Sequence, residues 1–537
     1  MWLQRLSIDN YRSIEHAEVD FDPGFNAIFG ENGTGKSNLV RSILKLLGPT
    51  YPGAHSFAVS DHLHADESRE IRIALTFKDP TRTSTLSWEP TGGGGSRLLL
   101  DGRGVKDAER ETLCPIYFPA NREVRELPGQ NSWNPLGRIL SELSELIRAN
   151  QPVRTAFDAK ASELNQVLEA SPEFAEFKRK LREYAAAHLG RTGSGLDLHL
   201  SLVDPEEALR TMQVFELQNG RQYNASTSGM GVQSGIVMGA LRAFASVAGG
   251  RFFVVADEPE AYLHPLSQQA LRLVFEALAS SGTQVIVTTH SPHFISSDSL
   301  QGLHKVWLDG GATRVLRYRY ADHLALLGGI GVTAATEESV KARLSHHLSV
   351  EAREGLFAKV VVLCEGESEA GSLGLWAKAM GNDFPTEGIA VVPTHGKFSL
   401  PTLALFYKAL KLPTFVVFDS DSTKTGRDRT KHAETNKLIL KISNAQEEEF
   451  PTTGAFSQHA VFAPDFEKVV RSSDQRYGAQ ETQVNEELGL RPDGAKGTRA
   501  RYVALAYREA HQSTPTPIAD LVRAIEAFRS SGGAIAH

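Results

Sequence analysis

Residues 30–37 of this chain have the sequence GENGTGKS, a glycine-rich segment that ends in a lysine and a serine. The preceding residues 25–29, FNAIF, form a short apolar run, and residues 36–47, KSNLVRSILKLL, carry apolar residues at helical spacing. A turn of this composition between a strand and a helix is the phosphate-loop pattern, in which backbone N–H groups approach nucleotide phosphates. The pattern predicts an α/β domain that binds ATP through Gly30, Asn32, Gly33, Gly35, Lys36 and Ser37.

Two later segments supply the partners that such a loop needs. Residues 254–265, VVADEPEAYLHP, place carboxylates after an apolar strand, and residues 288–292, TTHSP, place a histidine at the end of another strand. An acidic residue in this position can also cap a helix, and an isolated histidine is often structural. The roles predicted beside the phosphate loop are Mg²⁺ binding for Ser37 and Asp257, activation or orientation of the attacking water for Glu258, and recognition of the γ-phosphate for His290.

The composition is that of a folded protein without a global basic field. The chain has 537 residues, of which 41% are hydrophobic, and a formal net charge of −7, so any contact with nucleic acid must come from local patches. Its two cysteines, Cys114 and Cys364, lie in apolar runs and are expected to be buried thiols of a reducing compartment. No apolar stretch has the length of a membrane span, and we expect a cytoplasmic protein with no membrane contact.

The pattern changes along the chain indicate several units. Residues 136–190 show long helical periodicity within the first domain, and the last third alternates strands and helices as a small parallel sheet does. The predicted organisation is residues 1–135 and 191–320 for the ATPase domain, 136–190 for a helical insertion, 321–350 for a linker, 351–480 for the parallel-sheet domain, and 481–537 for a C-terminal helical segment that completes its site.

Carboxylates follow several strands of this C-terminal sheet. Residues 416–422, VVFDSDS, end an apolar run with two aspartates on alternate positions, which share one face of a strand. Because the carboxyl ends of parallel strands meet at one edge, we expect these and other carboxylates to converge there. The candidate ligands are Glu365, Glu369, Asp419, Asp421, Asp465 and Glu467.

Such a concentration of negative charge requires neutralisation. Oxygen ligands without a nearby histidine or cysteine cluster indicate Mg²⁺ or Mn²⁺ and exclude a zinc-type site. Two ions at this edge would activate water and stabilise the leaving oxygen of a phosphodiester. The alternative interpretation of any single pair is a solvated carboxylate or a helix cap.

These motifs resemble known families. The order of phosphate loop, STSGMGVQS at 226–234, VVADEPEAYLHP and TTHSP resembles an ABC-type ATPase head of recombination and chromosome-maintenance proteins. Glu365 with Asp419 and Asp421 matches the Toprim pattern of topoisomerases, primases and certain nucleases. The whole chain is similar to the OLD (overcoming lysogenisation defect) family. In ABC heads the signature segment of one subunit closes on the ATP of its partner, a role that the resemblance implies for Ser228, Gly229, Gly231 and Gln233.

The resemblance implies an ATP-controlled, Mg²⁺- or Mn²⁺-dependent DNA endonuclease of bacterial phage defence. It implies a homodimer formed through the helical insertion and the ATPase heads, and in some members a helicase-like partner. Gly396 and Lys397 are further matches, and Lys496 would stabilise negative charge in the transition state, with Glu365 as the catalytic carboxylate. Basic residues near these motifs would hold phosphates, or would simply be solvated: Lys424, Arg427, Arg429, Lys431, Arg499 and Arg501.

Two other functions remain open from the sequence. One is a DNA-clamping ATPase like RecF or the SMC proteins, with the C-terminal sheet as an interaction module. The other is a Toprim nuclease that acts on RNA. The carboxylates that follow three strands of the C-terminal sheet argue against a protein that only clamps DNA. The sequence does not distinguish a DNA substrate from an RNA substrate.

Overall fold

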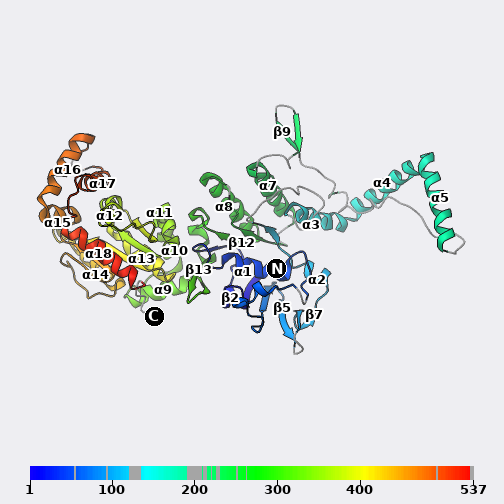
Figure 1. Ribbon diagram of the computed structural model, residues 1–537, viewed down its shortest axis with the longest axis horizontal. Helices are drawn as coiled ribbons and strands as arrows, with labels where there is room; N and C mark the ends of the chain where they lie inside the picture. Colours follow the sequence, from blue (N-terminus) through cyan, green and yellow to red (C-terminus); the bar gives the residue numbers. More distant parts are fainter. Residues whose placement is uncertain are drawn as a thin grey trace.

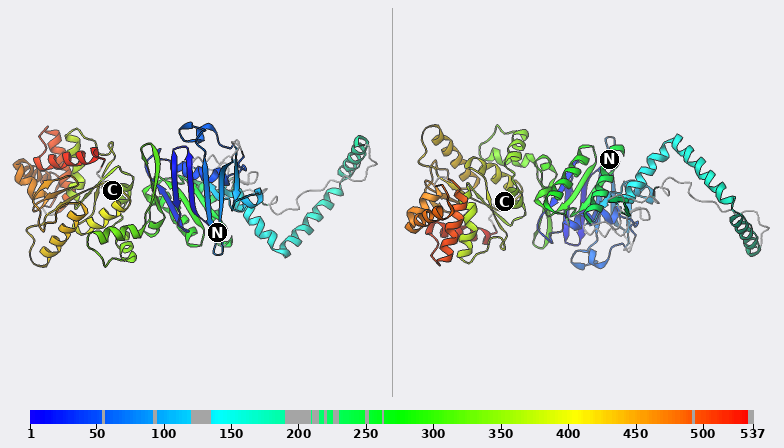
Figure 2. Two further views of the ribbon diagram at one scale, coloured as in Figure 1. Left: turned by 90° about the horizontal axis from the view of Figure 1, so that it is seen from below. Right: turned by 90° about the horizontal axis from the view of Figure 1, so that it is seen from above.

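The computed structural model describes residues 1–53, 56–91, 95–119, 135–189, 209, 215–218, 221–224, 230–248, 252–261, 263–491 and 494–532. The molecule is elongated, with the N-terminal domain in the middle and the C-terminal domain at one end (Figure 1). Helices α4 (Gln151–Glu169) and α5 (Pro172–Leu189) of the insertion project from the opposite end, as both views of Figure 2 show.

The N-terminal domain contains two six-stranded sheets with helix α1 (Lys36–Leu47) packed between them. The first sheet is antiparallel and has the order β2-β1-β4-β5-β6-β7, with β1 (Trp2–Tyr11), β2 (Ile14–Asp20), β4 (Arg72–Lys78), β5 (Thr83–Thr91), β6 (Gly95–Leu100) and β7 (Arg103–Gly104). The second has the order β14-β13-β3-β12-β11-β8, with β3 (Phe25–Phe29), β8 (Ile116–Phe118), β11 (Phe253–Asp257), β12 (Gln284–Thr289), β13 (Leu303–Asp309) and β14 (Ala312–Arg317). This region also contains a short helix, α2 (Asp107–Glu111), and a hairpin of β9 (Phe215–Gln218) and β10 (Arg221–Asn224).

The second sheet is buried on both faces, which explains its nearly continuous apolar strands. Its strands β3, β12, β11 and β8 are parallel, and only β14 at the edge is antiparallel. Ile28, Val255 and Ile286 face α1 and the first sheet, whereas their neighbours along each strand face the other layer. That layer includes α7 (Met230–Ala248) and α8 (Pro265–Ser280).

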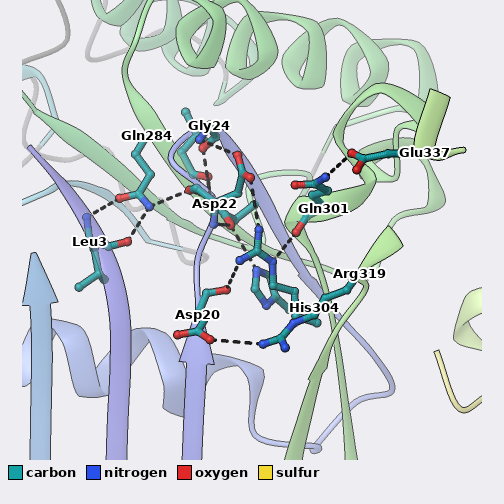
Figure 3. Close-up of polar contacts among 12 residues, drawn as sticks. Leu3, Asp20, Asp22, Gly24, Gln284, Gln301, His304, Arg319 and Glu337 are labelled. Carbon is teal, nitrogen blue, oxygen red and sulfur yellow. Dashed lines mark hydrogen bonds and ion pairs between the residues drawn. The ribbon is translucent and has the colours of Figure 1, made fainter. Parts of the chain in front are cut away.

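A buried polar network joins the sheets at the end opposite the phosphate loop (Figure 3). The Gln284 side chain accepts from Leu3 N–H at 2.9 Å and donates to the Leu3 carbonyl at 2.8 Å and the Asp22 carbonyl at 2.9 Å. His304 is fully buried against Asn26, and burial lowers its pKa to about 3, so its ring is neutral. These contacts join the two sheets and fix the start of β3.

The helical insertion consists of α3 (Pro135–Ala149), α4 (Gln151–Glu169) and α5 (Pro172–Leu189). Leu136 and Ile139 of α3 are buried against the ATPase domain. The other two helices extend away from the body (Figures 1 and 2). The insertion therefore presents its outer helices to solvent in a single chain.

Three helices connect the two domains where the sequence suggested a linker: α9 (Tyr320–Gly329), α10 (Glu337–His347) and α11 (Val350–Glu354). Their apolar residues belong to one hydrophobic core that runs from the second ATPase sheet into the C-terminal sheet. Lys305 of β13 adds a polar contact, because its Nζ donates to the carbonyl oxygens of Leu410 at 3.2 Å and Lys411 at 2.9 Å. The domains are thus packed together rather than tethered.

The C-terminal sheet has the order β16-β15-β17-β19-β18. Its strands are β15 (Val360–Cys364), β16 (Ile389–Pro393), β17 (Thr414–Asp419), β18 (Gly454–Ala455) and β19 (His459–Phe462), and all pairs are parallel except β18 with β19. The helices are α12 (Glu367–Ala379), α13 (Leu400–Ala409), α14 (Gly426–Ile442), α15 (Phe466–Ser473), α16 (Gln475–Leu488), α17 (Lys496–Glu509) and α18 (Thr516–Ser530). The predicted α/β multidomain fold with a parallel C-terminal sheet is confirmed.

Two smaller expectations concern burial and membranes. Cys114 and Cys364 are both buried free thiols, as predicted. Within the described ranges, no helix combines the length and the apolar character needed to cross a bilayer.

Candidate functional sites

The phosphate loop is shaped by close packing against β13 and β14. Gly30 has φ 152°, and a Cβ there would lie 2.0 Å from the Val306 carbonyl oxygen. Gly35 has φ 102°, and its Cβ would lie 2.3 Å from Thr313 Oγ1. That hydroxyl also donates to the Thr34 carbonyl at 2.9 Å. The positive φ and the close contact leave room only for glycine at each position. Packing against β13 and β14 therefore explains both glycines, in addition to the demands of phosphate binding.

Lys36 and Ser37 begin α1 beneath this loop. Lys36 Nζ donates to the carbonyl oxygens of Gly30 at 2.9 Å and Glu31 at 2.7 Å. Burial lowers the pKa of Lys36 to about 8, and the nearby carboxylates oppose this shift. Ser37 Oγ lies 3.2 Å from Asp257 Oδ1, which places the two predicted Mg²⁺ ligands side by side.

The residues predicted to act on the γ-phosphate also lie together. Glu258 has a left-handed backbone with φ 46°, and its N–H donates to the Thr288 carbonyl at 3.0 Å. Its Oε1 lies 3.0 Å from His290 Nε2. Burial lowers the pKa of His290, with the Lys36 charge as the next cause, so the imidazole is neutral near pH 7 and can donate or accept.

Sequence reasoning missed Glu260, which holds this histidine loop. Its Oε1 accepts from Thr289 Oγ1 and from the His290 N–H, each at 2.7 Å. Burial raises the pKa of Glu260. In the sequence, the only sign of this role was the position of Glu260 three residues after Asp257. A carboxylate at that position could equally well cap a helix.

The signature segment is only partly described. Ser228 and Gly229 lie outside the described residues, and Gly231 and Gln233 lie in the first turn of α7. Asn32 and Gly33 are exposed at the tip of the phosphate loop, where φ of Gly33 is 76°.

Four of the six predicted carboxylates form a mostly buried group at the carboxyl edge of the C-terminal sheet, which we call the acidic cluster: Glu365, Glu369, Asp419 and Glu467. Glu365 Oε2 accepts from the Asp419 N–H at 3.1 Å, and Asp419 Oδ1 accepts from the Phe466 N–H at 2.9 Å. Ser368 Oγ donates to Glu467 Oε1 at 2.8 Å. Backbone and hydroxyl donors therefore fix three of these carboxylates.

Burial and neighbouring charge raise the pKa of three carboxylates of the acidic cluster. Burial, followed by the charges of Glu467 and Glu365, raises the pKa of Glu369 to about 7. Burial, followed by the charge of Glu369, raises the pKa of Asp419 well above its usual value. Burial also raises the pKa of Glu365. Such shifts are common where carboxylates are assembled to bind cations.

Asp421 has different neighbours. Strand β17 ends at Asp419, and Asp421 has a left-handed backbone with φ 54°, so the alternation that predicted a shared face stops before it. Its Oδ2 accepts from Lys397 Nζ at 2.8 Å and lies 2.9 Å from His432 Nδ1. Lys397, which also donates to the Asp419 carbonyl, is buried. Asp421 is thus already paired with cationic and polar groups, a role that sequence reasoning did not give to Lys397 or His432.

Asp465 also differs from its expected place. It is the N-cap of α15, where Oδ1 accepts from the Lys468 N–H at 2.9 Å and Oδ2 pairs with Lys468 Nζ at 2.8 Å. This is the helix-cap alternative that the sequence left open. Its neighbour Glu467 faces the acidic cluster instead.

Lys496 reaches the acidic cluster from α17. Its Nζ lies 3.4 Å from Glu467 Oε1, and 60% of its side chain is exposed. The position depends on a close crossing of α12 and α17, since a Cβ on Gly371 would lie 2.8 Å from the Gly497 carbonyl oxygen. Lys496 is therefore mobile enough to meet a ligand yet anchored beside the carboxylates.

The chemistry of the acidic cluster fits hard divalent cations. All of its donors are carboxylate oxygens, which Mg²⁺ and Mn²⁺ prefer. Within the part of the chain that the structure describes, no three acidic, histidine or cysteine side chains yet surround a single point closely enough to enclose an ion.

The basic residues beside the cluster separate into two kinds. Lys424, Arg427 and Lys431 are exposed around the start of α14. Arg499 is buried and donates to Asn485 Oδ1 at 2.7 Å and to two backbone carbonyls, so it is a structural residue rather than a phosphate contact. Arg501 is exposed.

Comparison with known proteins agrees with both sites. Residues 1–85 and 106–295, just over half of the chain, match the AAA ATPase domain family. Residues 356–421 match the Toprim domain of overcoming lysogenization defect-like proteins. The OLD nuclease of Thermus scotoductus is 25% identical over 92% of this chain and 97% of its own length. The Old nuclease of Escherichia phage P2 is 26% identical over 78% of this chain and 77% of its own.

Among solved structures, an SMC head bound to the C-terminal winged-helix domain of ScpA covers 60% of this chain and 99% of its own, with 16% identity and a TM-score of 0.39.

The helix crossing gives a matched pair of substitutions. Gly371→Ala should lower the free energy of unfolding by about 1–3 kcal/mol, because its Cβ would overlap the Gly497 backbone. Gly374→Ala lies one turn further along α12, where no atom stands within 4 Å, and should be neutral or stabilising by up to about 1 kcal/mol. Urea denaturation measures both, and equal effects would contradict the role of the crossing.

The raised pKa values predict that stability depends on pH. In unfolded chains these carboxyls titrate near pH 4, so between that value and about 7 the folded, metal-free protein binds more protons than the unfolded chain. The contribution of these carboxyls to stability should therefore fall as the pH rises from 5 to 8 in EDTA, whereas buried histidines such as His304 contribute in the opposite direction below about pH 6.5. Divalent cations should remove most of this fall.

Glu369→Gln isolates the cluster's share of this effect. Relative to wild type, the neutral isostere should make the change in melting temperature with rising pH less negative in EDTA, and it should weaken the stabilisation by Mg²⁺. The control is Glu434→Gln, an exposed position on α14. Scanning calorimetry from pH 5 to 8 gives the result, and an unchanged slope in Glu369→Gln would reject the assignment.

Proposed function

The chain belongs to the OLD family, which joins an ATPase domain to a Toprim nuclease domain, and from this premise we propose that it is an ATP-dependent endonuclease that hydrolyses DNA with divalent cations. The observation that carries the nuclease activity is the acidic cluster at the edge of a parallel sheet, with Lys496 beside it. A site of this kind has no evident use in a protein that only clamps DNA.

The residues divide the work of phosphodiester hydrolysis. Glu365, Glu369, Asp419 and Glu467 would hold Mg²⁺ or Mn²⁺, and binding would draw these carboxylates together. The bound ions, two in our proposal, supply an activated water and stabilise the leaving oxygen. Lys496 is free to turn toward the scissile phosphate and to stabilise its added negative charge. Lys397 keeps Asp421 and the end of β17 in place.

The ATPase site has a matching division of labour. Lys36 would exchange its two loop carbonyls for the β- and γ-phosphates, and Ser37 and Asp257 would hold one Mg²⁺. Glu258 would orient the attacking water, and His290 would contact the γ-phosphate. The partner's signature segment, Ser228, Gly229, Gly231 and Gln233, would close the site from across a dimer.

The insertion supports a homodimer. Val153, Leu164 and Val167 of α4 are exposed by 45%, 44% and 67%. Together with Phe157 they fall at the a and d positions of a heptad pattern. We propose that this stripe packs against a second copy of the chain. A cytoplasmic setting, a part in defence against phages and a helicase-like partner complete the proposal, and they rest on family membership.

Plasmid cleavage tests the nuclease. Wild type should nick or linearise supercoiled DNA with Mg²⁺ or Mn²⁺, and the cleavage rate of Asp419→Ala should be at least about 100-fold lower, since one of the carboxylates that would hold the ions is removed. Asp465→Asn is the matched control, because asparagine also caps helices and the activity should persist. Lys36→Ala, with and without ATP, reports whether nucleotide promotes or restrains cutting.

Other outcomes of that assay identify the alternatives. Intact DNA in every lane, with ATP still hydrolysed, would favour the clamp, and cleavage of RNA alone would favour the RNA nuclease. Equal cutting by wild type and Asp419→Ala would reject the acidic cluster as the site.

The dimer is tested on α4. The double variant Leu164→Glu with Val167→Glu should convert the protein from twice the mass of one chain to a monomer, because it places charges in an apolar seam. Ser162→Glu with Gln166→Glu adds the same charge to exposed polar positions of the same helix and should remain dimeric. Light scattering after gel filtration measures the mass, and two variants of equal mass would contradict the proposal.

A further inference from the structure

An exposed aromatic ring stands beside the proposed nuclease site. Phe398 is 57% exposed, although its chain neighbours Lys397 and Ser399 are only 2% and 9% exposed. All three form a single 3₁₀ turn that follows β16. A large apolar side chain directed outward from a buried turn costs hydration free energy, and such rings often mark a binding surface.

The turn that carries Phe398 is anchored to the carboxylates. Lys397 donates to both the Asp419 carbonyl and Asp421 Oδ2. Its neighbour Phe398 is therefore held at a set position relative to the end of β17. A ring fixed in this way loses little conformational freedom when it binds a ligand.

A second ring supports the first. His432 of α14 contacts Phe398, with ring centroids 5.1 Å apart and planes at 51°. His432 Nδ1 also lies 2.9 Å from Asp421 Oδ2. The His432 ring thus lies against Asp421 directly, the turn that carries Phe398 is joined to the same carboxylate through Lys397, and Phe398 remains exposed.

Basic side chains lie on the segment that carries His432. Lys424, Arg427 and Lys431 are exposed on the loop and helix that carry His432. Arg429 is placed by its contact with the Phe450 ring, 4.0 Å from guanidinium carbon to centroid, and by a 2.7 Å bond to the Ser422 carbonyl. Aromatic rings among basic side chains are the arrangement with which proteins hold unpaired nucleic acid, because bases stack while phosphates pair with cations.

We propose that Phe398, supported by His432, is a stacking subsite for an unpaired nucleobase next to the acidic cluster. The subsite selects DNA that is single-stranded or locally melted at the position to be cut. It rests on the proposed nuclease function and adds the form of the substrate. The adjacent cations hold the flanking phosphates without reading sequence.

The test compares strands that differ only in their bases. Fluorescein-labelled 20-nucleotide thymidine strands, with the central ten residues either intact or abasic, are titrated with full-length protein in Ca²⁺, and strand integrity is checked on a gel. Wild type should bind the intact strand more tightly. Phe398→Leu should lower affinity for the intact strand about 5- to 100-fold and leave the abasic strand unchanged.

Two control variants separate stacking from general damage. Phe398→Trp keeps an aromatic ring and should retain the preference for the intact strand. Phe456→Leu removes a second exposed phenylalanine, which also contacts a histidine ring but lies before β19 at the opposite end of the sheet. It should bind both strands as wild type does.

The outcomes distinguish this inference from the nuclease proposal. If Phe398→Leu binds the intact strand as tightly as wild type, or weakens both strands equally, the stacking subsite is rejected even when plasmid is cut. If base-dependent binding is lost in Phe398→Leu while no variant cuts DNA, the subsite is supported and the nuclease proposal fails.

Discussion

The electrostatic repulsion among buried carboxylates is the constraint on which the C-terminal domain depends. Glu365, Glu369, Asp419 and Glu467 share one sheet edge, and burial raises the pKa of the first three, with the charges of other cluster members adding to the shifts of Glu369 and Asp419. Such a cluster destabilises the folded protein unless protons, cations or hydrogen-bond donors compensate its charge. The fold supplies backbone N–H groups, the hydroxyl of Ser368, and Lys496 at the rim. The close crossing of α12 and α17 is needed because it brings Lys496 to this edge.

The junction between the domains gives this edge a physical connection to the ATP site. Lys305 lies on β13 opposite Phe29, the last residue of the strand that leads into the phosphate loop. Its ammonium group bonds the carbonyls at the end of α13, and the next element, β17, ends at Asp419. Burial lowers the pKa of Lys305 to about 8, which shows how far this contact is withdrawn from water. One hydrophobic core fills the same junction. If nucleotide binding shifts the phosphate loop, packed side chains rather than a flexible linker would therefore resist the shift or transmit it to the C-terminal domain.

Much of the fold and the general location of both sites could be predicted from the sequence, because strand ends and glycine-rich turns are local signals. Lys36, Ser37 and Asp257 meet as expected, and so do Glu365, Glu369, Asp419 and Glu467. The placements that could not be predicted depend on information that the sequence does not carry. An N-cap such as Asp465 and a metal ligand have the same side chain, and only the local backbone decides between them. The partnership of Asp421 with His432 depends on the docking of α14, and the need for Gly371 depends on a helix that follows more than a hundred residues later.

The division between Asp419 and Asp421 explains how an acidic site can accept an anionic substrate. Had both aspartates joined the acidic cluster, a phosphodiester would meet negative charge on every side. The left-handed turn at Asp421 instead directs that carboxylate toward Lys397 and His432, so its charge is compensated locally. Phe398 shares its turn with Lys397, and the exposed cations of the α14 region belong to the segment that carries His432, whereas the carboxylates proposed to bind ions lie at the strand ends. A strand placed between them would have its phosphates near positive charge and one phosphate against the ions. In the proposed nuclease, one residue in an unusual backbone conformation would thus separate the binding of cations from the binding of substrate.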